Sequence, residues 1–196
     1  MSVLDAALRP IVRMSATRAN SRAGLIADVI IALVLIFAGL RHVDVRPVLA
    51  LLTIVAGLLL FSLVEYCFHR WLFHGSVQVM EQGHDKHHQD PLGDDSLPFF
   101  LPPIGMLVLA GIFDLAMPTS YALLLAGAMA CGYSAYGLSH SVIHSVRFRH
   151  PLSKRWAAIH HIHHHHPDTN FGVTTPLWDI VLGTRYVPNR NRSGMR

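Results

Sequence analysis

The sequence is poor in charged side chains. Only 14% of its 196 residues are Asp, Glu, Lys or Arg, whereas an ordinary soluble domain carries about 25%. Together with an apolar content of 52%, this shortage excludes a disordered chain, a coiled coil and an ordinary soluble domain. The apolar residues also occur in long runs, which indicates a membrane protein.

Cysteine is scarce as well. Cys67 and Cys131 both lie in apolar surroundings, and their spacing does not indicate a disulfide bond. This excludes a disulfide framework. The net charge is +4, but the arginines flank apolar segments, so we expect membrane orientation rather than nucleic-acid binding to explain it. The first apolar run begins only after residue 22 without a small-residue cleavage site, so we expect no cleavable signal peptide.

Four apolar segments have the length of a membrane-spanning helix, which needs about 20 residues. They are residues 23–40, 47–64, 99–117 and 119–138. Pro118 separates the last two segments and predicts a tight hairpin. The Gly, Ala and Ser residues of the last segment favour close helix packing. The sequence therefore predicts an all-α integral membrane protein with four transmembrane helices.

The basic residues predict the orientation of these helices. With four spans, both termini and the 69–98 loop share one side, which carries 14 of the 16 Lys and Arg residues. The positive-inside rule places that side in the cytoplasm. The same side carries 14 of the 15 histidines, all except His42. We expect residues 1–22 to form a cytoplasmic or interfacial arm and residues 189–196 a flexible tail.

Histidine is the residue in excess, and its spacing indicates metal binding. Residues three or four apart share a helix face, so His140 and His144 could bind one ion, and each His-x-x-His-His triplet could serve two neighbouring ions. The five-residue spacing of His69 and His74 predicts that these two are split between the ions. The predicted ligands are His69, His74, His84, His87, His88, His140, His144, His160, His163 and His164.

The last histidine run permits a second register and a second interpretation. The alternative ligands in the run are His161, His164 and His165. Alone, the run could be a metal-sequestering tract, but three other clusters on the same membrane side disfavour that interpretation. We interpret His42, His150 and His166 as surface or helix-end side chains. The expected fold thus gains a cytoplasmic helical cap that holds a histidine-rich dinuclear metal site.

The order of the four motifs resembles the fatty acid hydroxylase superfamily, which includes sterol desaturase-like oxygenases. The flanks Glu65–His74, His84–Pro91 with Leu97–Pro103, and Asn170–Asp179 with Gly183-Thr184 resemble its fatty acid and ceramide 2-hydroxylase branch. The resemblance covers about residues 47–187 and implies a membrane hydroxylase domain over residues 23–188.

The resemblance implies a membrane enzyme that activates O2 at two Fe ions and hydroxylates, or desaturates, a C–H bond of a lipid acyl chain. The dimetal centre itself would be the catalyst, without a separate side-chain base, and Zn could replace Fe in purified protein. One ion would be bound by His69, His84, His87, His140 and His144. The other would be bound by His74, His88, His160, His163 and His164.

The positions of further residues suggest supporting roles, and the resemblance also bears on the electron donor. Candidates to orient the histidine rings are Glu65, Asp85, Asp168 and Asp179. Trp71, Phe73, Tyr133 and Tyr136 could line the substrate path or, equally, anchor the chain at the membrane interface. Ceramide 2-hydroxylases often carry a fused cytochrome b5 domain, for which we expect no room here. Electrons would then come from a separate ferredoxin, cytochrome or reductase docking on the cytoplasmic face.

Three alternatives stand beside this hypothesis. Within the superfamily, the chain could be a sterol or carotenoid oxygenase or desaturase, although the 170–179 tail and the Glu65-Tyr66 opening favour an acyl hydroxylase. A membrane metal-binding or transport protein is the alternative of another class. Against it, ionisable residues are nearly absent from the middle of the spans, with Asp28 the exception. A structural zinc protein without turnover is the third.

Overall fold

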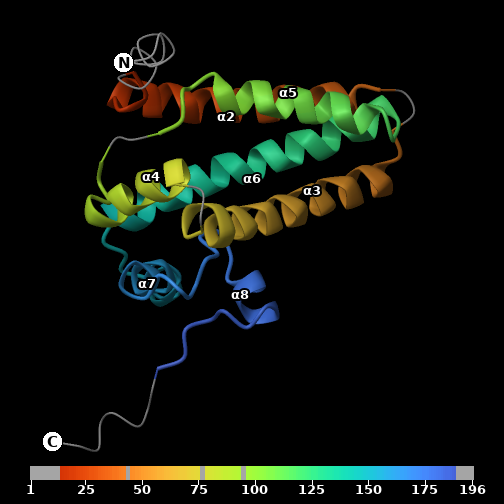
Figure 1. The fold of residues 1–196 in the computed structure, drawn as a ribbon. Coiled ribbons are helices and arrows are strands. Elements are labelled where there is room, and N and C mark those ends of the chain that lie inside the picture. The colour runs from red at the N-terminus through yellow and green to blue at the C-terminus, as the bar shows by residue number, and fades with distance from the viewer. Residues whose placement is uncertain (1–13, 43–44, 76–77, 94–95, 189–196) are drawn as a thin grey trace, which may run out of the picture.

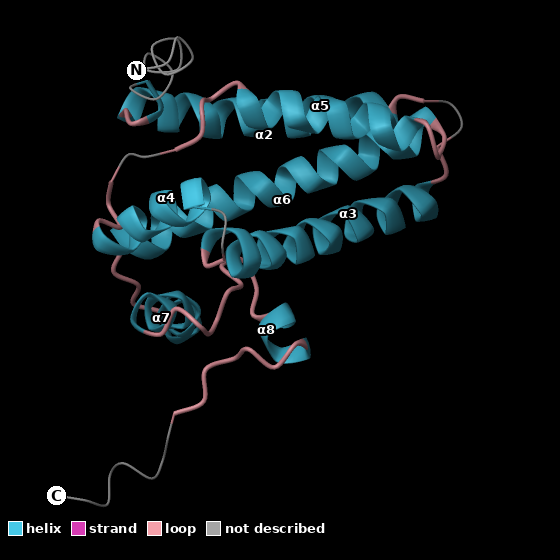
Figure 2. Cartoon of the chain, viewed as in Figure 1, coloured by secondary structure: helices cyan, strands magenta, loops and turns pink. Residues whose placement is uncertain are grey.

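The computed structural model describes residues 14–42, 45–75, 78–93 and 96–188. Regular secondary structure in these ranges is entirely helical, which confirms the predicted all-α class (Figure 2). The helices are α2 (Arg18–Leu40), α3 (Pro47–Cys67), the π-helix η1 (Phe68–Phe73), α4 (Gln78–Gln89), α5 (Leu101–Asp114), α6 (Thr119–Ser145), α7 (Pro151–His165) and α8 (Leu177–Val181). Most of the predicted 1–22 arm and the 189–196 tail lie outside the described residues.

Three helices of the described chain are long and apolar enough to cross a membrane. They are α2, α3 continued by η1, and α6. The predicted 99–117 span instead forms α5, whose 14 residues extend about 21 Å, less than the about 30 Å of a hydrocarbon core. Prolines bound this helix, because Pro102 and Pro103 fit only its first turn and Pro118 follows its end.

The start of α2 is tied to the segment before α5. The helix begins at Arg18, ahead of the predicted boundary, because the Thr17 hydroxyl accepts a hydrogen bond from the Asn20 backbone N–H at 3.2 Å. The buried Asn20 side chain donates to the Leu97 carbonyl at 2.8 Å and accepts from the Phe99 N–H at 3.0 Å. These bonds fix the entrance to α5 against α2.

Helix α6 lies at the centre of the bundle and packs against α2, α3 and α5 (Figure 1). Small residues allow the close approach. A Cβ atom at Gly57 of α3 would lie 2.6 Å from the Cβ of Ala128, and one at Gly127 would lie 2.9 Å from the backbone nitrogen of Ile36 in α2. Because van der Waals packing of small residues holds membrane helices together, this seam rigidifies α6.

The histidine-bearing elements gather at one end of the bundle. The α2–α3 link and the α5–α6 turn lie at the opposite end, on the right of Figure 1. Helices α4 and α7 lie near the ends of α3 and α6 that carry His69 and His144 (Figure 1). The topology thus brings four clusters that are distant in the sequence to a common place.

Candidate metal centre

Nine of the ten predicted histidines form two groups. Within each group, one ring nitrogen from every histidine lies within 4.8 Å of those of the others. The first histidine group is His69, His74, His84, His88 and His163. The second histidine group is His87, His140, His144 and His160. The tenth, His164, lies between them: its Nε2 is 3.2 Å from Nε2 of His160, and its ring stacks on His88 with centroids 4.3 Å apart.

The π-helix η1 explains why His69 and His74 lie in the same group. Their spacing would separate them on an α-helix, and this was the basis for predicting that they bind different ions. In η1 the backbone N–H of His74 instead bonds the carbonyl of His69, five residues earlier, at 3.2 Å. The two rings consequently stack with centroids 5.2 Å apart. The structure thus places both rings in one group, whereas the prediction from spacing assumed α-helical geometry.

The two triplets each contribute to both groups, as their helical spacing predicts. In α4, His84 and His88 lie on one helix face and belong to the first group. The His87 ring belongs to the second group, and its centroid lies 4.3 Å from that of His140. In α7, His163 faces the first group and His160 the second. The division of the histidines into groups therefore differs from the ligand sets that the resemblance implied.

Two rings of the first group are oriented by backbone carbonyls. Nδ1 of His69 lies 2.5 Å from the carbonyl oxygen of Phe171, and Nδ1 of His163 lies 2.8 Å from that of Thr169. A carbonyl only accepts, so both rings carry their proton on Nδ1 and leave a lone pair on Nε2. Nε2 of His163 lies 3.0 Å from Nε2 of His74, and Nε2 of His69 lies 3.0 Å from that of His84.

The loop that supplies these carbonyls is held by Glu65. This buried carboxylate projects from α3, one turn before His69. Its Oε1 accepts hydrogen bonds from the backbone N–H groups of Val173 and Thr174 at 2.6 and 2.9 Å, and its Oε2 accepts from the Thr174 hydroxyl. Within the described chain, Glu65 therefore does not bond a histidine directly but fastens the 169–174 loop to the histidine-bearing end of α3.

Asp179 holds the same loop from its other side. It is fully buried, and its Oδ1 accepts from the Phe171 N–H at 2.8 Å and the Thr184 hydroxyl at 2.7 Å. Its Oδ2 accepts from the Gly172 N–H at 2.9 Å. Buried carboxylates that accept several hydrogen bonds are strong fixed points. Asp179 and Glu65 thus bracket the loop whose carbonyls orient His69 and His163.

The other predicted neighbours divide into contacting and exposed side chains. Phe73 stacks on His84 with ring centroids 5.2 Å apart, and Tyr136 stacks on His140 at 5.7 Å. Tyr133 contacts Tyr136 rather than a histidine. In contrast, Trp71 is 55% exposed, and the structure also leaves the carboxylates of Asp85 and Asp168 exposed.

The histidine run separates into buried and exposed rings. His160 and His163 are almost completely buried within the groups, and His164 is half-buried between them. His161 and His165 are exposed. Outside the groups, His150 caps the start of α7 and His166 stacks on Tyr186.

Sequence reasoning missed the part played by the backbone of the 169–174 loop. Asn170 adopts a left-handed conformation with φ 56°, and its side chain donates to the Ile159 carbonyl of α7 and accepts from the Tyr186 N–H. This turn directs the carbonyls of its two neighbours, Thr169 and Phe171, toward the histidines. The available signal in the sequence was Asn170 itself, a residue type that tolerates positive φ.

Burial keeps the clustered imidazoles neutral. Desolvation, with smaller contributions from neighbouring rings, lowers the pKa of His87 to about 4 and that of His164 to about 2. Desolvation likewise lowers the pKa of His163 to about 3. At pH 7 these side chains offer lone pairs rather than charges. Nε2 of His87 is also buried, with no hydrogen-bond partner among the described residues. Converging neutral imidazoles of this kind could hold transition-metal ions.

Comparison with known proteins agrees with this geometry. Residues 54–184 match the fatty acid hydroxylase family. A dihydroceramide fatty acyl 2-hydroxylase of Arabidopsis thaliana is 30% identical over 143 residues, covering 67% of this chain and 59% of the plant protein. The fatty acid 2-hydroxylase of Homo sapiens is 30% identical over 145 residues, covering 65% of this chain and 38% of the human protein. The chain thus spans less than two thirds of the length of these relatives.

A solved structure shares the fold. The visible hydroxylase domain of full-length scs7p superposes with a TM-score of 0.76 at 22% sequence identity, covering 93% of this chain and 70% of that one. The family match includes all four histidine clusters, from His69 to His164, and both carboxylates that hold the 169–174 loop. This chain belongs to the fatty acid hydroxylase family, and its curated relatives are fatty acid and ceramide 2-hydroxylases.

Proposed function

We propose that this chain is an O2-dependent hydroxylase that acts on the acyl chain of a membrane lipid. The observation that carries the proposal is the pair of adjacent histidine groups with converging ring nitrogens, in a member of this family. The similar proteins are fatty acid and ceramide hydroxylases, which favours an acyl substrate over the sterol or carotenoid alternative.

Two iron ions would be bound, one by each histidine group. The first group would supply its five imidazoles. The second would supply four, with His164 as the fifth, because its Nε2 lies beside that of His160. Bound iron would supply the O2 activation and C–H cleavage that no side chain can perform. An all-imidazole donor set also suits zinc, so purified protein could carry zinc in place of iron.

The chain's own residues would orient ligands and exclude water. The carbonyls of Thr169 and Phe171 keep the protons of His163 and His69 on Nδ1, away from the ions. Glu65 and Asp179 hold those carbonyls in place. Phe73 and Tyr136 cover ring faces in the two groups, which limits access of water to the ligands.

The histidine-bearing end would face the cytoplasm, and α5 would complete four membrane helices despite its shorter length. The basic residues on that side support this orientation. A lipid would then meet the ions near its polar end. Electrons would arrive from a separate ferredoxin, cytochrome or reductase that docks beside α4 and α7.

Metal analysis, O2 consumption and lipid mass spectrometry test the proposal together. We expect protein purified without oxygen to carry about two iron ions per chain and to consume O2 when supplied with a reductant and lipid. Cells that express it should accumulate hydroxylated acyl chains. Hydroxylated sterols or carotenoids without hydroxylated acyl chains would contradict the assignment of substrate, and metal uptake into vesicles without O2 consumption would contradict the enzyme class.

A further inference from the structure

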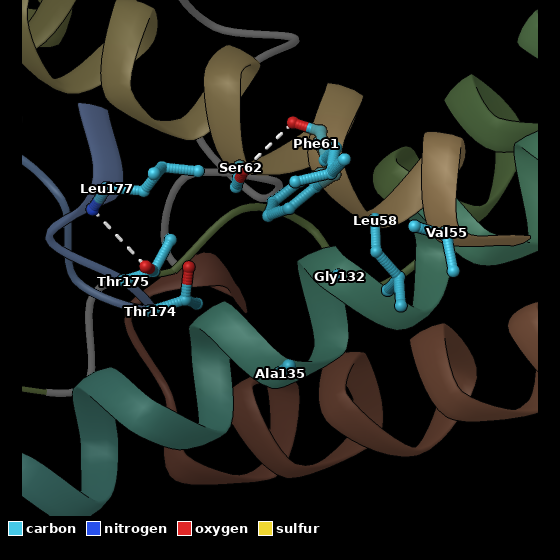
Figure 3. Close-up of a pocket in the computed structure, with 10 residues that line it drawn as sticks. Val55, Leu58, Phe61, Ser62, Gly132, Ala135, Thr174, Thr175 and Leu177 are labelled. Atoms are coloured by element: carbon cyan, nitrogen blue, oxygen red, sulfur yellow. Dashed lines mark hydrogen bonds between the residues drawn. The ribbon is translucent and has the colours of Figure 1, made fainter. Parts of the chain in front are cut away.

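A cavity of about 390 Å³ lies between α3 and α6, beside the segment that leads into α8 (Figure 3). This volume is within the range of small-ligand sites, about 300–1,000 Å³. The cavity is lined by Val55, Leu58, Leu59, Phe61, Ser62, Gly132, Ala135, Thr174, Thr175 and Leu177. No residue of this lining belongs to the histidine groups, so the cavity is a separate feature of the described chain.

The outer wall of the cavity faces the bilayer. Val55, Leu58 and Leu59 are 44%, 42% and 48% exposed on α3, one of the helices long enough to cross the membrane. The inner wall is formed by buried Phe61 and by Gly132, where a Cβ atom would lie 2.6 Å from the Phe61 ring. A ligand in this cavity would therefore reach it sideways from the lipid phase.

The hydroxyl groups around the cavity are already bonded to the protein. Ser62 accepts from the Trp178 indole at 3.0 Å and donates to the Leu59 carbonyl. Thr174 donates to Glu65, and Thr175 accepts from the Leu177 N–H. Since these groups are engaged, the cavity offers apolar surface to its occupant. Such a surface fits a hydrocarbon chain and not a polar head group.

Aromatic rings connect the cavity wall to the second histidine group. The Phe61 ring lies 6.1 Å from that of Tyr133, Tyr133 lies 6.4 Å from Tyr136, and Tyr136 lies 5.7 Å from His140. Along α6, Gly132 precedes His140 by a rise of about 12 Å. A lipid with its polar end near the histidines would therefore have later carbons of its chain at the depth of the cavity.

We propose that this cavity binds the acyl chain of a membrane lipid and that Ala135 limits how much of the chain it accepts. The inference rests on the proposed function for the identity of the lipid. Ala135 lines the cavity from α6 opposite the α3 side chains (Figure 3). A larger side chain at this position projects into the space that the chain fills, whereas the helix itself tolerates it.

Photo-crosslinking tests the occupant directly. The full chain is placed in bilayer discs that contain a ceramide with a diazirine in its amide-linked acyl chain, and labelled peptides are identified by mass spectrometry. We expect labelling of the α3 and α6 peptides that carry Leu58 and Ala135. In Ala135→Leu this labelling should fall about tenfold. In the matched control Gly137→Leu, where a Cβ meets open space on the same helix, it should be unchanged.

The outcomes separate this inference from the proposed function. Labelling spread evenly over lipid-facing peptides and unaffected by Ala135→Leu would overturn the binding site. The proposed membrane-lipid occupant would also be overturned if a free fatty acid bearing the same diazirine labelled the cavity and the ceramide did not. Specific, Ala135-dependent labelling in a protein that forms no hydroxylated product would overturn the proposed function alone. In active protein, Ala135→Leu should shift the hydroxylated products toward shorter acyl chains, and Gly137→Leu should not.

Discussion

The two histidine groups use the same side chain but are held in different ways. In the first group, His69 and His163 donate from Nδ1 to backbone carbonyls of a loop that two buried carboxylates fasten. In the second, Nε2 of His87 and Nδ1 of His160 are buried without hydrogen-bond partners in the described chain. The protein therefore preorganises the first group, whereas we expect the geometry of the second to depend more on a bound ion.

The largest effect should come from removing the α6 ligands. His140 and His144 belong only to the second group, so His140→Ala/His144→Ala should abolish hydroxylation and reduce the metal content from about two ions per chain to about one. Elemental analysis after anaerobic purification measures this. Retention of both ions would contradict the division into two groups.

Asp179→Asn should weaken the first group selectively. The introduced amide has to place its N–H₂ against either the Gly172 N–H or the Phe171 N–H and Thr184 hydroxyl, and a backbone N–H cannot reverse its role. We expect a loss of about 2 kcal/mol in stability and an about 10- to 100-fold weaker affinity for one ion. Competition with a chelator measures the affinity. The control is Asp114→Asn, at an exposed residue that ends α5 far from the histidines, and equal weakening at both ions would contradict selectivity.

Acidification should destabilise the metal-free protein. The folded-state pKa of His87 is about 4 and that of His163 about 3, both below the 6.5 of the unfolded chain. The unfolded state therefore binds more protons below pH 6.5, and the stability present at neutral pH is lost as the pH falls. Between about pH 7.5 and about pH 5 we expect the Tm of the metal-free protein to fall by about 5 °C. An unchanged Tm would indicate that the rings are hydrated.

Glu65→Gln should act in the same direction as Asp179→Asn but less strongly. The glutamine oxygen can keep both backbone donors, and the Thr174 hydroxyl can turn to accept from the new amide. We expect an about threefold to tenfold weaker affinity for the first ion. Glu65→Ala, which frees the loop, should exceed that loss, and a reversed order of the two variants would contradict the anchoring role.

The smallest effect is expected at the exposed rings of the histidine run. His161→Ala/His165→Ala should leave metal content unchanged and alter stability by less than about 0.5 kcal/mol. His164→Ala should weaken binding at the second group, because its Nε2 lies beside that of His160. Loss of an ion from the His161/His165 variant would favour the alternative register.

Side-chain spacing predicted much of the centre because α4, α6 and α7 are regular helices. His84 and His88 share a face, as do His140 and His144, and both triplets serve two groups as their periodicity requires. Two features could not be predicted from spacing. The FHRWLF sequence of η1 contains no Pro or Gly to signal its π geometry. The hydrogen bonds that orient His69 and His163 are accepted by main-chain carbonyls, which every residue possesses.

The membrane helices also combine features that could be predicted from the sequence with features that could not. Hydropathy located α2, α3 and α6, and the small residues of α6 predicted its close packing. The 99–117 segment was expected to be a full span because its apolar run is long, but the helix there comprises only Leu101–Asp114, with Pro102 and Pro103 in its first turn. The contacts by which Asn20 ties the start of α2 to residues 96–99 could not be predicted, because those residues are remote in the sequence.

Helices α3 and η1 form one continuous rod, but the π-helix rotates the side-chain faces after it relative to those before it. Each residue of an α-helix turns the chain by about 100°, and the wider turn at Phe68–Phe73 accommodates an additional residue without breaking the rod. Before it, Leu58 and Leu59 are exposed on a helix long and apolar enough to cross a membrane, and after it the ring of His74 stacks on that of His69. Deleting one residue from this segment would rotate His74 out of the first group while leaving the apolar pattern of the helix intact. The length of this one turn thus determines whether a continuous helix can both present apolar side chains along α3 and place His69 and His74 in the first histidine group.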